Sequence, residues 1–209
     1  MMNRLIICMF FLVAFTSCVE KVNQKNAYQE LRDITEKKLF KKNEKFLAHS
    51  YCYFVFQGVL NPTQVTPKLF SLYVKGGSLS QAYLKDYANW LQTENGKLCQ
   101  QVIGEDFQHL SISKGKKYIV LLNQMAIERD KESVELIYHH ELLHVAYAHF
   151  PNQREKVQKQ WTQLTPKQQQ SFKQKRVGYN FENPKILQRE FFAYSYQNHP
   201  EEGVMMLVR

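Results

Sequence analysis

Apolar positions along the chain recur with two different periods, and the period predicts which segments are helices and which are strands. In residues 28–47 and again in residues 79–91, apolar side chains stand among polar ones at helical spacing. Residues 51–60 are rich in aromatic side chains and valine, which fits either a strand or a buried helix. Gly76-Gly77-Ser78 indicates a break between elements.

The second half of the chain predicts a hairpin followed by a long helix. Residues 110–113 alternate between apolar and polar, and residues 118–122 form a β-branched apolar run with a turn signal before it. Asp130 precedes a strongly periodic segment that continues to about Phe150, where Pro151 stops it. This segment is the most regular helical pattern in the chain.

Further helices are expected towards the C-terminus. Residues 152–176 are rich in glutamine and lysine and predict two short helices, the second beginning at Thr165-Pro166. A last helix is expected over residues 184–197. The predicted fold class is therefore α+β, mostly helical, with a small antiparallel sheet or hairpin before the long helix.

The N-terminus resembles an export signal. A basic start is followed by an apolar run, Leu5–Phe15, which is too short for a membrane span of about 20 residues. The next residues, Thr16-Ser17-Cys18, resemble a bacterial lipoprotein processing site. The resemblance implies cleavage before Cys18 and acylation of its thiol and new amino group. An ordinary signal peptide with a chance cysteine is the alternative interpretation.

The export signal decides how the net charge and the cysteines are interpreted. The formal charge of +9, from 28 basic and 19 acidic side chains, favours anionic partners. Export excludes nucleic acid from the expected partners and places the chain in the bacterial cell envelope, anchored to a membrane by lipid. Cys52 and Cys99 then lie in an oxidising compartment. A disulfide between them would stabilise the fold by about 2–4 kcal/mol, and two free buried thiols are the alternative.

Basic side chains are concentrated in residues 153–176. This segment is either a docking surface for an anionic partner such as lipid or the solvated face of a helix pair, and the second interpretation is favoured.

The candidate chemistry lies in His140-Glu141-Leu142-Leu143-His144, inside the predicted long helix. Residues four apart lie on one helical face, so His140 and His144 can bind one ion at about 2.0–2.1 Å. Glu141 is close enough to accept a proton from water at that ion. The flanking residues are apolar, and buried histidines and carboxylates cost several kcal/mol without a partner. The motif therefore predicts a zinc site.

A catalytic zinc site needs a third protein ligand. Glu190 is the best candidate, because apolar residues flank it in the last predicted helix and a buried carboxylate needs a partner. On a solvated face, Glu190 would instead pair with Arg189 or Lys185. Glu182 and Glu155 are weaker candidates, since they lie in more polar stretches.

Other polar residues have subsidiary roles in this hypothesis. His149 lies five residues beyond His144 and His139 lies one residue off the ligand face, so neither is expected to bind the ion. A hydrogen-bond donor for the developing oxyanion is also expected. Tyr194, one turn from Glu190, is the first candidate, and Tyr179 and His199 are the others.

At these residues the chain resembles the gluzincin metallopeptidases, which carry His-Glu-x-x-His on one helix and a ligand glutamate on a later helix. The resemblance covers roughly residues 110–198. It implies zinc bound by His140, His144 and Glu190, with Glu141 as general base. It also implies an edge strand that pairs with extended substrate, a position that residues 118–122 fit. The chain departs from the family at Tyr194, where many gluzincins have an aspartate that orients a zinc histidine.

The predicted function is a membrane-anchored, zinc-dependent metallopeptidase acting on a peptide or protein substrate. Two alternatives stay open: a non-catalytic zinc-binding envelope lipoprotein, and a zinc hydrolase that cleaves another bond, as in cell-wall material. Glu141 favours an enzyme, because a structural site needs a fourth ligand and not a base. The predicted regions are a signal peptide (1–17), a lipidated tether (18–27), a mostly helical region (28–105) and a zincin-like catalytic region (106–209).

Overall fold

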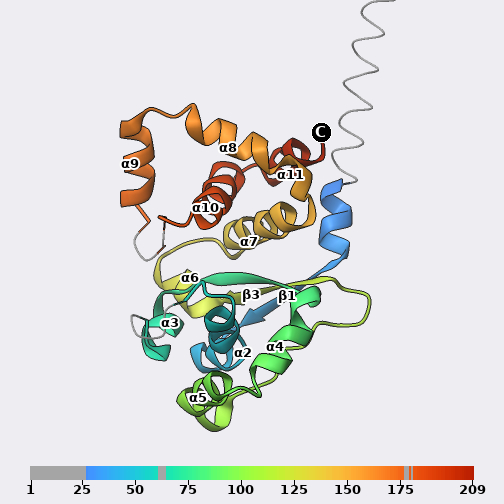
Figure 1. Cartoon of the computed structure of the whole chain (residues 1–209), viewed down its shortest axis with the longest axis vertical. Helices are drawn as coiled ribbons and strands as arrows, with labels where there is room; N and C mark the ends of the chain where they lie inside the picture. The colour runs from blue at the N-terminus through green and yellow to red at the C-terminus, as the bar shows by residue number, and fades with distance from the viewer. Residues whose placement is uncertain (1–26, 61–64, 177–178, 180) are drawn as a thin grey trace, which may run out of the picture.

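A three-stranded mixed sheet lies at the centre of the computed structural model, and helices cover both of its faces (Figure 1). The structure describes residues 27–60, 65–176, 179 and 181–209. The predicted signal peptide, Cys18 and the tether up to residue 26 lie outside this part of the chain. The α+β class and the mostly helical content are confirmed.

The sheet has the order β1-β3-β2. Its strands are β1 (Thr35–Phe40), β2 (Gly76–Ser80) and β3 (Tyr118–Asn123). β3 runs parallel to β1 and antiparallel to β2, so the sheet is mixed and not antiparallel as predicted. The predicted hairpin is also wrong, because residues 110–113 form no strand and both partners of β3 come from the first half of the chain.

Strand β3 is buried on both faces, which explains its continuous apolar sequence. Val120 and Leu122 pack into the core on one side of the sheet, while Ile119 and Leu121 pack into the core on the other. We call these the α7 face and the α2 face, after the main helix on each. A single strand with period-two alternation thus connects two hydrophobic cores.

The first predicted helix is divided in the structure. The chain is helical over residues 27–33, then forms β1, and turns helical again in α2 (Asn43–Phe56). Charged residues between the apolar positions of residues 28–47 predicted a helix. Part of this segment forms β1 instead, because β1 lies at the edge of the sheet, where charged side chains are tolerated. Most of the ambiguous segment 51–60 belongs to α2.

Gly76–Ser78 forms part of β2 and is not a break between elements. The two glycines are needed for close packing. A Cβ atom on Gly76 would lie 2.9 Å from Glu141 Cγ, and one on Gly77 would lie 2.0 Å from Phe54 Cζ. Glycine here marks a close approach of neighbouring elements to the strand from both sides.

The α2 face is covered by aromatic-rich helices and carries the disulfide. Besides α2, its helices are α3 (Pro67–Tyr73), α4 (Leu84–Trp90) and α5 (Glu94–Ile103). Cys52 of α2 and Cys99 of α5 are joined in a disulfide, with their Cα atoms 5.9 Å apart. The covalent bond therefore connects two helices of this one layer.

The α7 face carries the long helix and the C-terminal helices (Figure 1). After α6 (Gln124–Arg129) come α7 (Val134–His149), α8 (Arg154–Thr162), α9 (Pro166–Gln174), α10 (Pro184–Tyr196) and α11 (Pro200–Val208). Short 3₁₀ turns occupy Gln81–Tyr83, Gly104–Asp106 and Pro151–Gln153. Among the described residues, no helix is both long enough and apolar enough to cross a membrane.

Helix ends follow local capping rules. Ser133 caps α7 by accepting hydrogen bonds from the backbone N–H groups of Glu135 and Leu136, whereas Asp130 is the C-cap of α6. Thr165 caps α9 in a capping box with Gln168, and Pro166 follows as the first helical residue. Helix α11 was not predicted.

Candidate metal centre

Helix α7 carries three polar side chains into the core between the sheet and α10. The exposed fractions are 4% for His140, 7% for Glu141 and 5% for His144. Their surroundings are otherwise apolar, because α7 also contributes Leu142, Leu143 and Val145 to the core. Such burial of polar groups requires strong partners.

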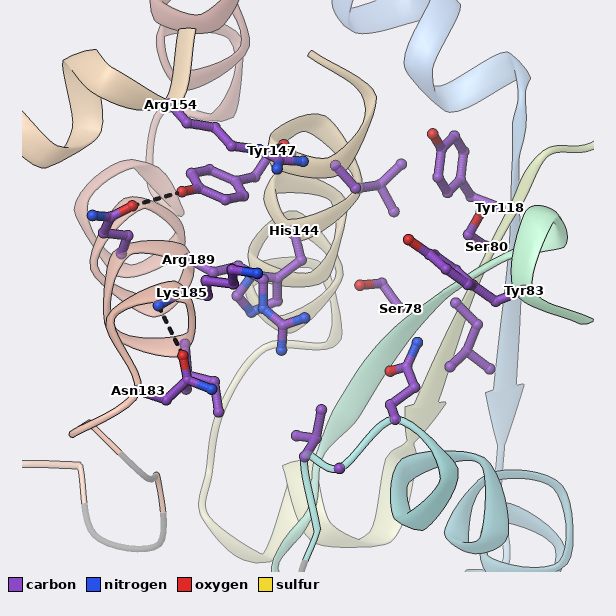
Figure 2. A pocket seen from close by; sticks show the side chains of 18 of the residues that line it. Ser78, Ser80, Tyr83, Tyr118, His144, Tyr147, Arg154, Asn183, Lys185 and Arg189 are labelled. Carbon is purple, nitrogen blue, oxygen red and sulfur yellow. Dashed lines mark hydrogen bonds between the residues drawn. The ribbon is translucent and has the colours of Figure 1, made fainter. Parts of the chain in front are cut away.

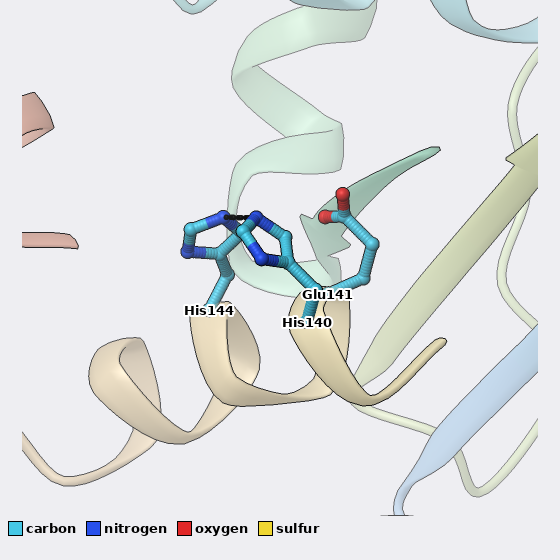
Figure 3. A group of neighbouring side chains, drawn as sticks. All are labelled: His140, Glu141 and His144. Atoms are coloured by element: carbon cyan, nitrogen blue, oxygen red, sulfur yellow. Dashed lines mark hydrogen bonds between the residues drawn. The ribbon is translucent and has the colours of Figure 1, made fainter. Parts of the chain in front are cut away.

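The donor atoms of these side chains converge on one point. Figure 3 shows the two imidazole rings next to each other above the helix, with the Glu141 carboxylate on the same side; the planes of the rings are 88° apart. Candidate ligand atoms of His140, Glu141 and His144 all lie within 4.8 Å of one another. Four-residue spacing on a rigid helix produces this convergence.

Helix α10 brings Glu190 against the same point. Its Oε1 lies 3.3 Å from His144 Nε2 and its Oε2 lies 3.4 Å from His140 Nε2, while the two Nε2 atoms are 3.1 Å apart. Glu190 is only 1% exposed. Two nitrogen atoms and one carboxylate thus form a compact triangle of donors.

The spacing of this triangle fits a metal ion. In a tetrahedral site with bonds of 2.0–2.1 Å, neighbouring donor atoms are about 3.3 Å apart. The three separations of 3.1–3.4 Å lie near that value, with the two from Glu190 running to different oxygens of its carboxylate. His140, Glu141 and His144 are therefore buried and positioned to bind a metal ion, with Glu190 within reach of the same position.

Electrostatics keep two of the three candidate ligands in the protonation states that metal binding requires, whereas at His140 burial is outweighed by the contact with Glu190, which raises the pKa. Burial lowers the pKa of His144 to about 4, so this imidazole is neutral near neutral pH. Burial alone would raise the pKa of Glu190, but His144 and His140 outweigh it and hold that pKa well below its usual range. A neutral imidazole and an ionised carboxylate are the metal-binding forms.

Glu141 differs from Glu190 in its environment. Burial raises the pKa of Glu141 to about 7, with a further contribution from Glu190 and opposition from His140. A carboxylate with a pKa in this range is a better proton acceptor than an ordinary glutamate. Of the two neighbouring carboxylates, Glu190 therefore suits metal binding and Glu141 suits proton transfer.

Gln197 orients one of the candidate ligands, and the sequence had not indicated it. Its Oε1 accepts a hydrogen bond from His140 Nδ1 at 3.1 Å, which leaves Nε2 of that ring free to face the donor triangle. Gln197 lies seven residues after Glu190, so two helical turns place it on the same side of α10. The seven-residue spacing from Glu190 could have identified Gln197 from the sequence.

Tyr194 contacts the candidate ligand through its ring. The centroids of the Tyr194 and His140 rings are 4.4 Å apart. Gln197 thus makes the polar contact to His140, while Tyr194, four residues after Glu190, packs against the His140 ring.

Two tyrosine hydroxyls lie beside the carboxylates. Burial raises the pKa of Tyr194, and partial burial together with Glu190 raises the pKa of Tyr179, which is 38% exposed, well above its ordinary value. The two hydroxyls hydrogen-bond to each other. Both stay protonated and can donate hydrogen bonds at neutral pH. His199, the third candidate donor, is exposed at the N-cap of α11.

The other sequence candidates lie elsewhere. His149 Nδ1 pairs with the Tyr118 hydroxyl at 3.1 Å, and His139 Nε2 pairs with Glu135 at 3.1 Å. The alternative third ligands are both exposed: Glu155 and Glu182.

The edge strand next to the site is β2 and not the predicted segment 118–122. That segment is the central strand β3, whose two sides are already paired with β1 and β2. Gly76 of β2 packs directly against Glu141. An extended ligand could therefore pair only with β2 on this side of the sheet.

A cleft of about 760 Å³ opens on the His144 side of the site (Figure 2). One wall contains Ser78 and Ser80 of β2, with Tyr83 beyond them. The opposite wall contains Tyr147 of α7 and Arg189 of α10. The cleft thus separates the edge strand from the helix that carries Glu190.

Comparison with known proteins gave no match: no family model, no curated protein and no solved structure matches this chain.

Proposed function

We propose that the protein is a zinc-dependent hydrolase, and specifically a metallopeptidase of the gluzincin type. One observation carries the proposal: the Nε2 atoms of His140 and His144 and the Glu190 carboxylate form a buried triangle with the spacing of a tetrahedral zinc site. Glu141 adds a carboxylate beside that triangle without being needed to complete it.

In this proposal, three of the four acidic and imidazole side chains would bind zinc and the fourth would transfer a proton. His140, His144 and Glu190 hold zinc, which supplies Lewis acidity to a water molecule and to a substrate carbonyl. Glu141 accepts the proton of the attacking water and passes it to the leaving amine. The close contact with Gly76 holds the Glu141 side chain in place for this transfer.

Neighbouring groups would bind and orient the substrate. The free edge of β2 pairs with an extended peptide backbone, which positions a peptide bond over the site. The Tyr194 hydroxyl, with Tyr179 as its partner, donates a hydrogen bond to the oxygen that becomes negatively charged. Gln197 keeps His140 in one tautomer.

The proposed location is the bacterial cell envelope, with the protein held on a membrane through lipid on Cys18. The Cys52–Cys99 disulfide supports this location, because such bonds persist mainly in oxidising compartments.

A non-catalytic zinc-binding module is the second candidate. His144 Nδ1 is buried and has no hydrogen-bond partner within the described residues. Ligand histidines of zinc enzymes almost always have such a partner. The same ligands would then hold zinc without turnover.

The test combines metal content with hydrolysis. We would purify the whole chain and its Glu141→Gln and Glu155→Gln variants without chelator, measure zinc per chain by mass spectrometry, and assay cleavage of a peptide library. We expect about one zinc per chain in all three, and a rate about 10²–10⁴-fold lower in Glu141→Gln alone.

Each other outcome has a definite meaning. Undiminished turnover in Glu141→Gln would refute the general-base role. Zinc without cleavage of any peptide by the unmodified chain would favour the binding module. A folded chain without zinc would overturn both candidates.

A further inference from the structure

The cleft beside the metal centre carries positive charge only. Arg189 and Lys185 of α10 and Arg154 of α8 line it, and its described lining includes no aspartate or glutamate. With 28 basic and 19 acidic side chains in the chain, a random patch with three cations would carry roughly two carboxylates. The lining is therefore more one-sided in charge than the chain as a whole.

Arg189 and Lys185 form a pair of like charges on one side of α10. They are four residues apart, and such a pair destabilises a helix unless an anion lies between or near the charges. Figure 2 shows both residues labelled at the α10 wall of the cleft, with Arg189 beside His144. Their position is thus unfavourable for the helix but suited to binding an anion.

Among the described residues, Arg189 has one ion-pair contact and Lys185 has none. The nearest acidic atom to Arg189 is Glu190 Oε1 at 3.7 Å, an oxygen that already lies 3.3 Å from His144 Nε2. Arg189 Nε is buried and has no hydrogen-bond partner among the described residues. Lys185 is exposed and forms no ion pair with any residue that the structure describes.

Arg154 extends the positive wall further from the metal centre. Its Nε donates a hydrogen bond to the Tyr147 carbonyl oxygen at 3.1 Å, and its guanidinium lies 5.0 Å from the centroid of the Tyr147 ring. These contacts fix the side chain, and no described carboxylate forms an ion pair with it. The cleft therefore has a fixed cation at the far end and two cations near the metal.

We propose that this cleft selects peptides that carry a carboxylate, which binds Arg189 and Lys185 while the backbone lies along β2. This proposal rests on the proposed peptidase function and names its substrate class. The guanidinium of Arg189, which lines the cleft, has the planar arrangement of N–H donors that can bind both oxygens of a carboxylate. The carboxylate comes either from an acidic side chain or from a free C-terminus.

The test measures binding to a variant that holds zinc but does not turn over. The whole Glu141→Gln chain, loaded with zinc in non-ionic detergent, is titrated into fluorescent peptides, and dissociation constants are measured by anisotropy. The peptide set is matched: glutamate against glutamine at each position, and a free C-terminus against an amide. We expect the peptide with the carboxylate to bind about 10–100-fold more tightly than its neutral counterpart.

Two charge variants localise the effect. Lys185→Glu adds a negative charge to the cleft, and we expect it to remove the preference for the carboxylate. Lys167→Glu makes the same change on exposed α9, outside the cleft, and should leave the preference within about twofold. A preference that survives Lys185→Glu would place the anion site elsewhere and overturn the assignment.

The outcomes separate this inference from the proposed function. A preference that depends on glutamate identifies an acidic side chain, and one that depends on the free C-terminus identifies a terminal carboxylate. Equal binding of charged and neutral peptides, or binding of neither, overturns the inference. The proposed function stands or falls separately, on zinc content and on cleavage by the unmodified chain.

Discussion

The two faces of the sheet are built from similar apolar material but treat polar groups differently. On the α2 face, the buried hydroxyls of Ser50 and Ser71 donate hydrogen bonds to backbone carbonyls of their own helices. On the α7 face, the buried polar groups His140, His144 and Glu190 face one another. The first arrangement satisfies polar atoms locally, whereas the second gathers them around one position.

This difference distinguishes the candidate metal site from ordinary buried polar groups. A polar side chain that bonds its own helix backbone needs nothing further. Buried groups brought together from two helices, with Glu190 Oε2 and His144 Nδ1 still lacking a hydrogen bond among the described residues, are costly unless something binds them. The α2 face is therefore a stabilising layer, and the α7 face carries the candidate metal site.

The disulfide gives the largest expected effect and tests the α2 face. It joins residues 47 apart, and a loop of that length corresponds to about 4 kcal/mol of stability. We expect Cys52→Ser/Cys99→Ser to lose about that much in urea denaturation of the zinc-free protein. Zinc affinity of the folded variant should stay within about twofold of the original, and a large fall would show that the two faces are coupled.

Glu190→Ala tests the α7 face. Removing the third donor should weaken zinc binding by more than about 100-fold, because even residues that only orient ligands contribute about 10–100-fold. Competition with a chromogenic chelator measures the affinity. The exposed Glu155→Ala is the matched control, and equal affinities in the two variants would move the third ligand away from Glu190.

Gln197 should have a smaller effect on the same measurement. Gln197→Leu removes the acceptor for His140 Nδ1–H and should weaken zinc binding by about 10–100-fold. Gln197→Glu keeps an acceptor and should restore most of the affinity, which a purely structural role would not predict. Gln170→Leu, on exposed α9, controls for the change of side-chain type.

Alanine substitutions at the adjacent glycines of β2 have the smallest expected effects and compare the two faces of the sheet directly. Gly76→Ala presses on Glu141 Cγ and should lower hydrolysis about tenfold with zinc affinity retained. Gly77→Ala presses on Phe54 on the other face and should cost about 1–3 kcal/mol of stability. If both variants lost only stability, the contact between Gly76 and Glu141 would have no role in catalysis.

Local sequence determined much of the candidate site. The spacing of His140 and His144 fixes their geometry once the segment is helical, because residues four apart meet on one face. The apolar neighbours of Glu190 indicated its burial, and the structure places its carboxylate beside both histidines. The cap at Thr165 and the helices α7 to α10 also followed from patterns within a few residues.

Only the tertiary structure decided how distant segments meet. The pairing of β3 with β1 and β2, the use of Gly76 and Gly77 as packing surfaces and the role of Gln197 all depend on contacts between remote parts of the chain. Periodicity reports which side of an element is apolar but not which element will cover it. The sequence therefore determined the donor residues, and the packing of α10 and β2 against α7 determined the site.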